Sequence, residues 1–195
     1  MKVLAISASP RMGGNSDVLC DEFLKGAMEA GHSCKKIRLA TKKLNPCRAC
    51  YACSKTHECI QKDDGNEILQ EMLEADVWVL GVPVYFYSMA SQLKMMIDRC
   101  LPCYLQMKDK QIYIVVTAAD PNHEAADVVL EEIRGFERCL PGCREKGIVY
   151  GTGTWQKGDV YHHPAMKDAF EMGKKIAESK RRRKRGSMKN RVGSS

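Results

Sequence analysis

A chain of 195 residues, 44% of them hydrophobic and 28% charged, has the composition of one soluble globular domain with a hydrophobic core. The first apolar run, in MKVLAISASP, is too short for a signal peptide, and no later run is long enough to span a bilayer. We therefore expect a cytoplasmic protein without membrane contact. Because the cytosol keeps thiols reduced, the ten cysteines are expected to be ligands, redox groups or core residues rather than a disulfide framework.

The net charge of +7 comes from the end of the chain. Residues 180–195 carry eight of the 31 Lys and Arg and no acid, which leaves 23 basic against 24 acidic residues in the rest. We predict one domain over residues 1–179 and a basic, disordered tail over residues 180–195. Nucleic acid is therefore expected as a partner only through the tail, where a run of this kind would bind phosphates with strong salt dependence.

Strand-like and helix-like segments alternate along the chain. KVLAIS, at residues 2–7, is an apolar run followed by Ser, Pro and Gly, which indicates a buried strand. ADVWVLGVP, at residues 75–83, is apolar on both faces, as a central strand of a parallel sheet should be. The strands that we predict cover residues 2–7, 33–40, 75–83, 111–117 and 147–151.

A helix is predicted after each strand. Asn15 or Ser16 can cap the first helix, and Asp64 with Glu67 can form a capping box at the start of the second. The other three helices are predicted from about Ser88, over residues 129–140, and from Pro164. This alternation predicts an α/β fold, in which a doubly wound parallel sheet of five strands carries helices on both faces.

The segment SASPRMGGNS, residues 7–16, joins the first strand to the first helix. It lacks the G-x-G-x-x-G pattern of dinucleotide-binding folds and instead offers hydroxyls, an amide, Arg11 and two glycines. Backbone N–H groups and the helix dipole favour an anion at this position, so the segment suits a single terminal phosphate. The alternative interpretation is an ordinary glycine-rich turn.

A second segment, GVPVYFYSMASQLKMMIDR at residues 81–99, leaves the end of the third strand with an apolar, aromatic loop. If the strand order is 2-1-3-4-5, the ends of strands 1 and 3 are neighbours and ligands bind in the crevice between them. A ligand with one phosphate and one flat ring would then contact both segments, and flavin mononucleotide (FMN) is the obvious candidate. The alternative is that these aromatic residues only cover the core.

The segment NPCRACYACSKTHECIQKDD, residues 45–64, contains the spacing Cys47-x2-Cys50-x2-Cys53-x5-Cys59. Three cysteines at successive x2 spacing favour an iron–sulfur cluster over zinc, because structural zinc sites usually pair two short knuckles across a longer span. Zinc, and a loop without metal whose thiols pack or oxidise, stay open as alternatives. The other six cysteines are assigned no function.

Taken together in their order along the chain, the three segments resemble the flavodoxin-like NAD(P)H-dependent FMN reductase family, and within it the iron–sulfur flavoproteins. The resemblance covers residues 1–175 and implies a flavodoxin-like fold with strand order 2-1-3-4-5, bound FMN, and homodimers or homotetramers. By position, it implies a phosphate turn with Ser9, Arg11, Asn15 and Ser16, a loop along the flavin ring with Pro83, Val84, Tyr85, Phe86, Tyr87 and Ser88, and closing loops that contain Thr117 and Gly151. It also implies that Cys59 joins Cys47, Cys50 and Cys53 on one [4Fe–4S] cluster.

These features predict an FMN-dependent oxidoreductase with no catalytic side-chain acid or base. NAD(P)H would reduce the flavin, which would pass electrons to a quinone, a flavin or another acceptor, or through the cluster. The alternative is a one-electron carrier that is reduced by a redox protein such as ferredoxin and lacks a productive nicotinamide site. A nucleic-acid-binding module is the third hypothesis, and the near-neutral body disfavours it.

Overall fold

The computed structural model describes residues 1–177 of the chain. The last two residues of the predicted domain and the predicted basic tail lie outside the described residues. Among residues 1–177, no helix is both long and apolar enough to cross a membrane.

The centre of the fold is a parallel sheet in the order β2-β1-β3-β5-β6. Counting only the parallel strands, this is the predicted order 2-1-3-4-5. All eight residues of β5 and the first seven of β3 are buried, because helices cover both faces of these central strands. The strands are β1 (Lys2–Ser7), β2 (Ser33–Arg38), β3 (Val77–Tyr85), β5 (Gln111–Ala118) and β6 (Arg144–Thr152), and β4 (Ser88–Met89) pairs antiparallel with β3.

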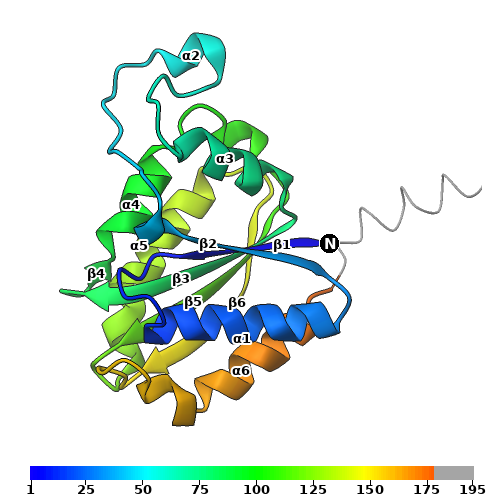
Figure 1. The fold of residues 1–195 in the computed structure, drawn as a ribbon, viewed down its shortest axis with the longest axis vertical. Helices are drawn as coiled ribbons and strands as arrows, with labels where there is room; N and C mark the ends of the chain where they lie inside the picture. Colours follow the sequence, from blue (N-terminus) through cyan, green and yellow to red (C-terminus); the bar gives the residue numbers. More distant parts are fainter. Residues whose placement is uncertain (178–195) are drawn as a thin grey trace, which may run out of the picture.

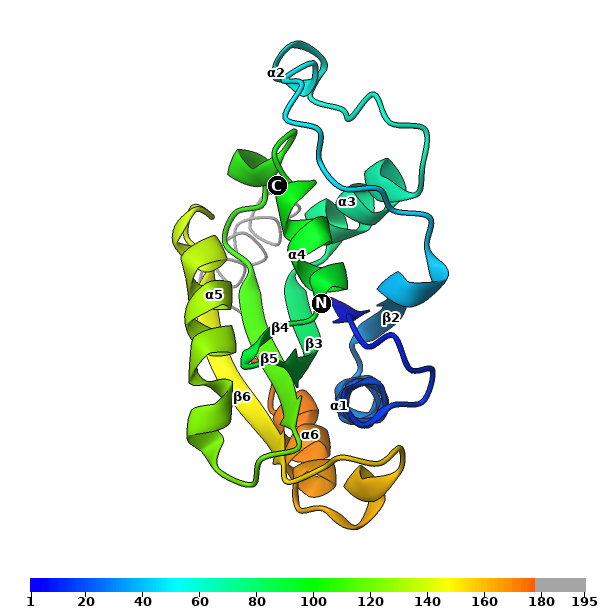
Figure 2. The ribbon, with the colours of Figure 1, turned by 90° about the vertical axis from the view of Figure 1, so that its left-hand side faces the viewer.

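Helices form a layer on each side of the sheet (Figures 1 and 2). Alternate residues of β1 show the division, since Leu4 and Ile6 join the core beneath α3, α4 and α5, whereas Val3 and Ala5 join the core beneath α1 and α6. The α-helices are α1 (Asn15–Glu29), α2 (Cys53–Thr56), α3 (Gly65–Glu74), α4 (Ser91–Asp98), α5 (Asp127–Arg138) and α6 (Ala165–Lys174). The 3-10 turns are η1 (Leu39–Thr41), η2 (Tyr104–Gln106), η3 (His123–Ala126) and η4 (Asp159–His162).

The predicted side-chain caps do not form, although Asp64 does occupy the N-cap position of α3 as predicted. Gly14 is the N-cap of α1 and makes no side-chain cap, and Asn15 and Ser16 lie inside the helix. The carboxylate of Asp64 accepts the N–H of Lys43 at 2.7 Å and makes no hydrogen bond to the N–H groups of α3, so the predicted capping box is absent. The helix expected from Ser88 begins at Ser91, because Ser88 and Met89 pair with β3.

Helices α1 and α6 approach each other so closely that two glycines are required. A Cβ atom on Gly26 would overlap the carbonyl oxygen of Phe170, and a Cβ atom on Gly173 would overlap that of Phe23. The two helix backbones are therefore in direct contact, on the face of the sheet to which Val3 and Ala5 contribute.

The cysteine loop, residues 45–64, is fastened to the body by a buried ion pair. Arg99, at the end of α4, binds both carboxylate oxygens of Asp63 at 2.8 and 2.9 Å and donates to the carbonyl oxygen of Asn45 at 2.8 Å. Both side chains are at most 2% exposed. Arg99 therefore joins the two ends of the loop, while the segment around α2 projects from the body (Figure 1).

We predict that Gly173→Ala destabilises the protein by about 2 kcal/mol, because the new methyl group must push two helix backbones apart. Gly135→Ala in α5 is the matched control. Its Cβ atom would meet only the Arg138 guanidinium at 3.7 Å, and it should stabilise by roughly 0.5 kcal/mol through helix propensity. Urea unfolding measures both, and equal effects at the two sites would contradict the close helix contact.

A second prediction concerns the acid limit of stability. The Arg99 guanidinium holds the pKa of Asp63 well below its usual range, against the opposing effect of burial. A depressed folded pKa contributes stability that is complete above the unfolded carboxyl pKa, about 3.9, and is lost as the pH falls below it.

We expect Asp63→Asn to cost about 3 kcal/mol at pH 7, because it leaves the Arg99 charge buried and unpaired. The variant should also lose less stability than wild type between about pH 4 and pH 2. The control is Asp98→Asn, which breaks the exposed ion pair with Lys94 and should change stability by less than about 1 kcal/mol. Urea unfolding at several pH values measures the free energy of unfolding of each protein. An equal loss of stability at low pH in wild type and Asp63→Asn would refute the assignment.

Candidate functional site

The predicted site segments begin at one edge of the sheet. In the strand register Ser7 lies beside Gly81, Pro83 beside Thr117, and Thr117 beside Gly151. The N–H of Ala8 also donates to the carbonyl oxygen of Gly81 at 2.8 Å, which joins the ends of β1 and β3. The turn after β1 and the loops after β3, β5 and β6 therefore leave the sheet on the same side, as parallel strands require.

The turn after β1 is held tightly by Ser9 and Arg11. The Ser9 hydroxyl accepts the N–H of Arg11 at 3.1 Å and donates to the carbonyl oxygen of the same residue at 3.2 Å. Gly13 has a positive φ of 65°, and a Cβ atom on Gly14 would lie 2.8 Å from the Ser9 oxygen. The two glycines are therefore needed for the turn to close before α1.

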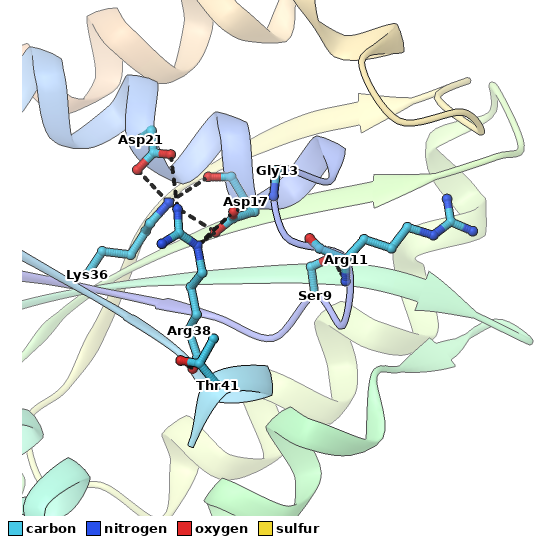
Figure 3. A network of polar contacts seen from close by, with 8 residues as sticks. All are labelled: Ser9, Arg11, Gly13, Asp17, Asp21, Lys36, Arg38 and Thr41. Atoms are coloured by element: carbon cyan, nitrogen blue, oxygen red, sulfur yellow. Dashed lines mark hydrogen bonds and ion pairs between the residues drawn. The ribbon is translucent and has the colours of Figure 1, made fainter. Parts of the chain in front are cut away.

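A buried carboxylate, Asp17, fixes the turn from the first turn of α1 (Figure 3). Asp17 is 1% exposed and accepts the N–H of Gly13 at 2.9 Å and the Nε of Arg38 at 2.9 Å. Lys36 lies 3.0 Å away. Burial alone would raise the pKa of Asp17, but the hydrogen bonds from Arg38, Gly13 and Lys36 outweigh it and lower this pKa. The side chain of Arg11 points away from this cluster (Figure 3).

Asn15 and Arg11 bind a loop from the other end of the chain. Asn15 donates to the carbonyl oxygen of Gln156 at 2.9 Å and accepts the N–H of Gly158 at 3.1 Å, and Arg11 donates to the carbonyl oxygen of Trp155 at 3.1 Å. The amide that was predicted to contact phosphate thus fastens the loop after β6 onto the turn.

Two further groups near the turn suit an anion. The Ser16 hydroxyl is buried and has no hydrogen-bond partner among the described residues. A buried hydroxyl in this situation is completed by a ligand or a water molecule. The second group is the ammonium of Lys157, which sequence analysis missed. It lies beside the turn, since its Nζ would be 3.5 Å from a Cβ atom on Gly13. These groups and the N-terminus of the 15-residue α1 fit a phosphate group.

The aromatic segment after β3 is a hairpin rather than an open loop. Val84 pairs with Met89 and Tyr85 with Ser88, which leaves Phe86 and Tyr87 as the two turn residues. Both have positive φ, 50° and 57°, as a type I′ hairpin turn requires, although Asn-Gly is the usual sequence there.

Exposure at the hairpin decides between the two interpretations of its aromatic side chains. Phe86 is fully exposed, Tyr87 is 61% exposed and Tyr85 is 37% exposed, so these rings do not cover the core. Pro83, Val84 and Tyr85 all lie within β3, and their prediction as loop residues was wrong. The described structure thus presents three aromatic rings at the same sheet edge as the glycine turn.

The two remaining predicted flavin contacts, Thr117 and Gly151, are strand residues. Thr117 is buried, and a Cβ atom on Gly151 would lie 2.9 Å from the methyl group of Thr117 and 3.0 Å from Leu19. Packing against β5 and α1 thus accounts for Gly151. The loops beyond these strands are joined by hydrogen bonds from Gly153 to Asp120 and from Thr154 to Ala118, both 2.9 Å.

The cysteine loop carries its four thiols on a curled backbone. Ala49, Tyr51 and His57 all have positive φ, and the N–H of Ala49 donates to the Cys47 sulfur at 3.4 Å. Cys47 and Cys50 are exposed, whereas Cys53 and Cys59 are half-buried. Within residues 1–177, no three Cys, His, Asp or Glu side chains are gathered closely enough to hold a metal ion. The donors fit an iron–sulfur cluster in kind and number, but their sulfur atoms do not meet at a common point.

The redox-like pair Cys100 and Cys103 is buried, and Cys103 lines the cavity that Cys53 of the cysteine loop also lines. Burial raises the pKa of Cys103 to about 11 and that of Cys100 still further. Burial therefore disfavours the thiolate form of both cysteines.

Two cavities are described, and neither includes Ser9 or Tyr85. One, of about 640 Å³, lies along the outer edge of β6 and includes His123, whose ring stacks on Tyr150 with centroids 4.2 Å apart. The other, of about 310 Å³, lies between α2 and residues 101–106, which line it together. The flavin crevice between the glycine turn and the hairpin therefore stays a prediction, supported by the shared sheet edge.

Comparison with known proteins shows which family the chain belongs to. Residues 1–133 match the family model described as NADPH-dependent FMN reductase. An iron–sulfur flavoprotein of Methanocaldococcus jannaschii is 36% identical over 187 residues, covering 91% of this chain and 96% of the relative. An iron–sulfur flavoprotein of Archaeoglobus fulgidus is 32% identical over 183 residues, covering 92% and 80%.

Among solved structures, an FMN-dependent NADH-azoreductase from Bacillus anthracis in complex with FMN has a TM-score of 0.70 at 17% identity. The match covers 91% of this chain and all of that one. NAD(P)H:quinone oxidoreductase from Methanothermobacter marburgensis has a TM-score of 0.69 at 17% identity, covering 91% and 99%. These structural matches establish the flavodoxin-like fold, and the sequence matches establish the family. The chain belongs to the NADPH-dependent FMN reductase family, as its three segments predicted.

Proposed function

We propose that this protein is an FMN-dependent oxidoreductase that passes electrons from NAD(P)H to a quinone, a flavin or another acceptor. The observation that carries the proposal is the placement of a glycine turn with an unpartnered buried hydroxyl and of three exposed aromatic rings at one sheet edge. The first suits a phosphate and the second a flat ring. Family membership supports the same cofactor.

Each part of the site has a separate task in this proposal. Ser9, Ser16 and the N–H groups at the start of α1 bind the phosphate, with Arg11 and Lys157 supplying positive charge. Asn15 acts indirectly by holding the loop after β6 over the turn. The hairpin residues Tyr85 to Ser88 lie along the flavin ring, with Thr117 and Gly151 shaping the strand ends. When bound, FMN would supply hydride acceptance and one- or two-electron transfer, and the protein would orient the ring and exclude water.

We also propose that Cys47, Cys50, Cys53 and Cys59 bind a [4Fe–4S] cluster. The four thiols, the N–H···S bond from Ala49 and the names of the two relatives support this proposal. The loop tip would have to contract around the cluster while the Asp63–Arg99 pair keeps its base in place. The second candidate function is an electron carrier that a redox protein such as ferredoxin reduces and that lacks a productive nicotinamide site. Homodimers or homotetramers are the expected assemblies.

We predict that protein purified anaerobically is yellow or brown, binds about one FMN per chain, and oxidises NADH or NADPH. Visible and EPR spectra with iron and sulfide assays measure the cluster, and Cys50→Ser should remove the cluster signal while FMN stays bound. Apoprotein that cannot be reconstituted with FMN would refute the enzyme. Flavin that ferredoxin reduces and NAD(P)H does not would favour the electron carrier.

The hairpin turn gives a prediction in which stability and function change in opposite directions. Replacing Phe86–Tyr87 with Asn–Gly supplies residues that tolerate positive φ and should raise the free energy of unfolding by about 1 kcal/mol. The same change removes two rings and should weaken FMN binding roughly tenfold. Thermal unfolding of the apoprotein and flavin titration measure the two effects, and tighter FMN binding by the variant would exclude the rings as flavin contacts.

A further inference from the structure

A carboxylate from a helix much later in the chain binds the aromatic hairpin. Glu132, in α5, accepts the Ser88 hydroxyl at 2.7 Å through one oxygen and the Met89 N–H at 2.9 Å through the other. Ser88 and Met89 are the two residues of β4, so both hydrogen bonds act on the returning strand of the hairpin. Each carboxylate oxygen therefore binds the hairpin directly.

The hairpin has reason to need this support. Its turn residues, Phe86 and Tyr87, have the positive φ values that aromatic residues adopt only with strain. Both are exposed, so little packing restrains them within the described chain. Strand β4 contributes only two residue pairs with β3, and an isolated ladder of that length is marginal in water.

We propose that Glu132 is a positioning residue for the flavin, because it sets the place of the hairpin against which the ring lies. The proposal rests on the proposed function, since it assumes that FMN binds between the hairpin and the glycine turn. Glu132 acts through Ser88 and Met89, and its role is one of reach and hydrogen bonding rather than of charge.

Reach and charge can be separated by substitution. Glu132→Gln loses the charge but keeps the length, so its amide oxygen can accept the Met89 N–H while its NH₂ group donates to the Ser88 oxygen. Glu132→Asp keeps the charge but is one methylene shorter and cannot hold both partners from the same helix position. Glu132→Ala removes both bonds. The matched control is Glu131→Ala, which removes an exposed carboxylate that pairs with Arg134 and Arg138.

The experiment measures dissociation constants of FMN and of riboflavin, which lacks the phosphate, with apoprotein of each variant by flavin fluorescence. Glu132→Ala and Glu132→Asp should weaken both ligands by the same factor, roughly tenfold. Glu132→Gln should stay within about threefold of wild type, and Glu131→Ala should match wild type. Ser16→Ala, at the phosphate turn, should weaken FMN but not riboflavin, which shows that the assay separates ring from phosphate contacts.

Hydrogen exchange of the Met89 amide in the apoprotein supplies a readout that is independent of flavin. It should be faster in Glu132→Ala and Glu132→Asp than in wild type and Glu132→Gln. Ser88→Ala removes one bond without touching Glu132, and its effect on flavin binding should largely disappear in the Glu132→Ala background.

Three results would overturn the proposal. In the first, Glu132→Ala binds both flavins as wild type does. In the second, the Asp variant retains binding while the Gln variant loses it, so that charge rather than position matters. In the third, Met89 exchange changes but flavin affinity does not, so that the contact supports only the fold. Wild-type apoprotein that binds no flavin would instead refute the proposed function together with this inference.

Discussion

The register of β1 beside β3 is the constraint on which the candidate site depends. Both strands are almost entirely apolar and buried on both faces, so sliding one past the other would disrupt two cores at once. The pairing of Ser7 with Gly81 then brings the turn after β1 and the hairpin after β3 to one edge, although their sequences are about seventy residues apart. Core packing thus places two segments that have few contacts of their own.

Carboxylates bind the backbone at three of the candidate segments. Asp17 takes the N–H of Gly13, and Glu132 takes that of Met89, while Asp63 takes that of Gly65. In each case a carboxylate holds backbone at the border of a candidate binding segment. Hydrogen bonds to ionised groups are stronger than neutral ones, which suits segments that must keep their shape without a large apolar core.

The strands of the sheet could be predicted from sequence because the patterns that specify them are local, whereas their order came from the family resemblance. Buried parallel strands appear as short apolar runs, and residues 75–83 show this plainly. The position of Asp64 at the start of α3 was predicted correctly, but the partners of the Asn15 and Asp64 side chains were not, since these side chains bind Gln156 and Lys43, which no local pattern contains.

The hairpin and its support were missed for a related reason. Phe-Tyr is not a usual turn sequence, and Glu132 lies 44 residues beyond Ser88. The same distance in sequence hid Lys157, which reaches the glycine turn from the loop after β6. The candidate segments and their chemistry could thus be predicted from the sequence, whereas the residues that position these segments were identified only in the structure.

Backbone strain in the described chain is concentrated where ligands are proposed. Of the six non-glycine residues with positive φ among residues 1–177, three lie in the cysteine loop, at Ala49, Tyr51 and His57, and two at the hairpin tip. Such conformations cost free energy and persist where the surroundings impose them. At both places the tip is exposed and the base is fastened by a carboxylate, Asp63 in one and Glu132 in the other. A fixed base with a strained, exposed tip is the arrangement expected of a segment that completes its contacts only when a ligand or a partner surface arrives.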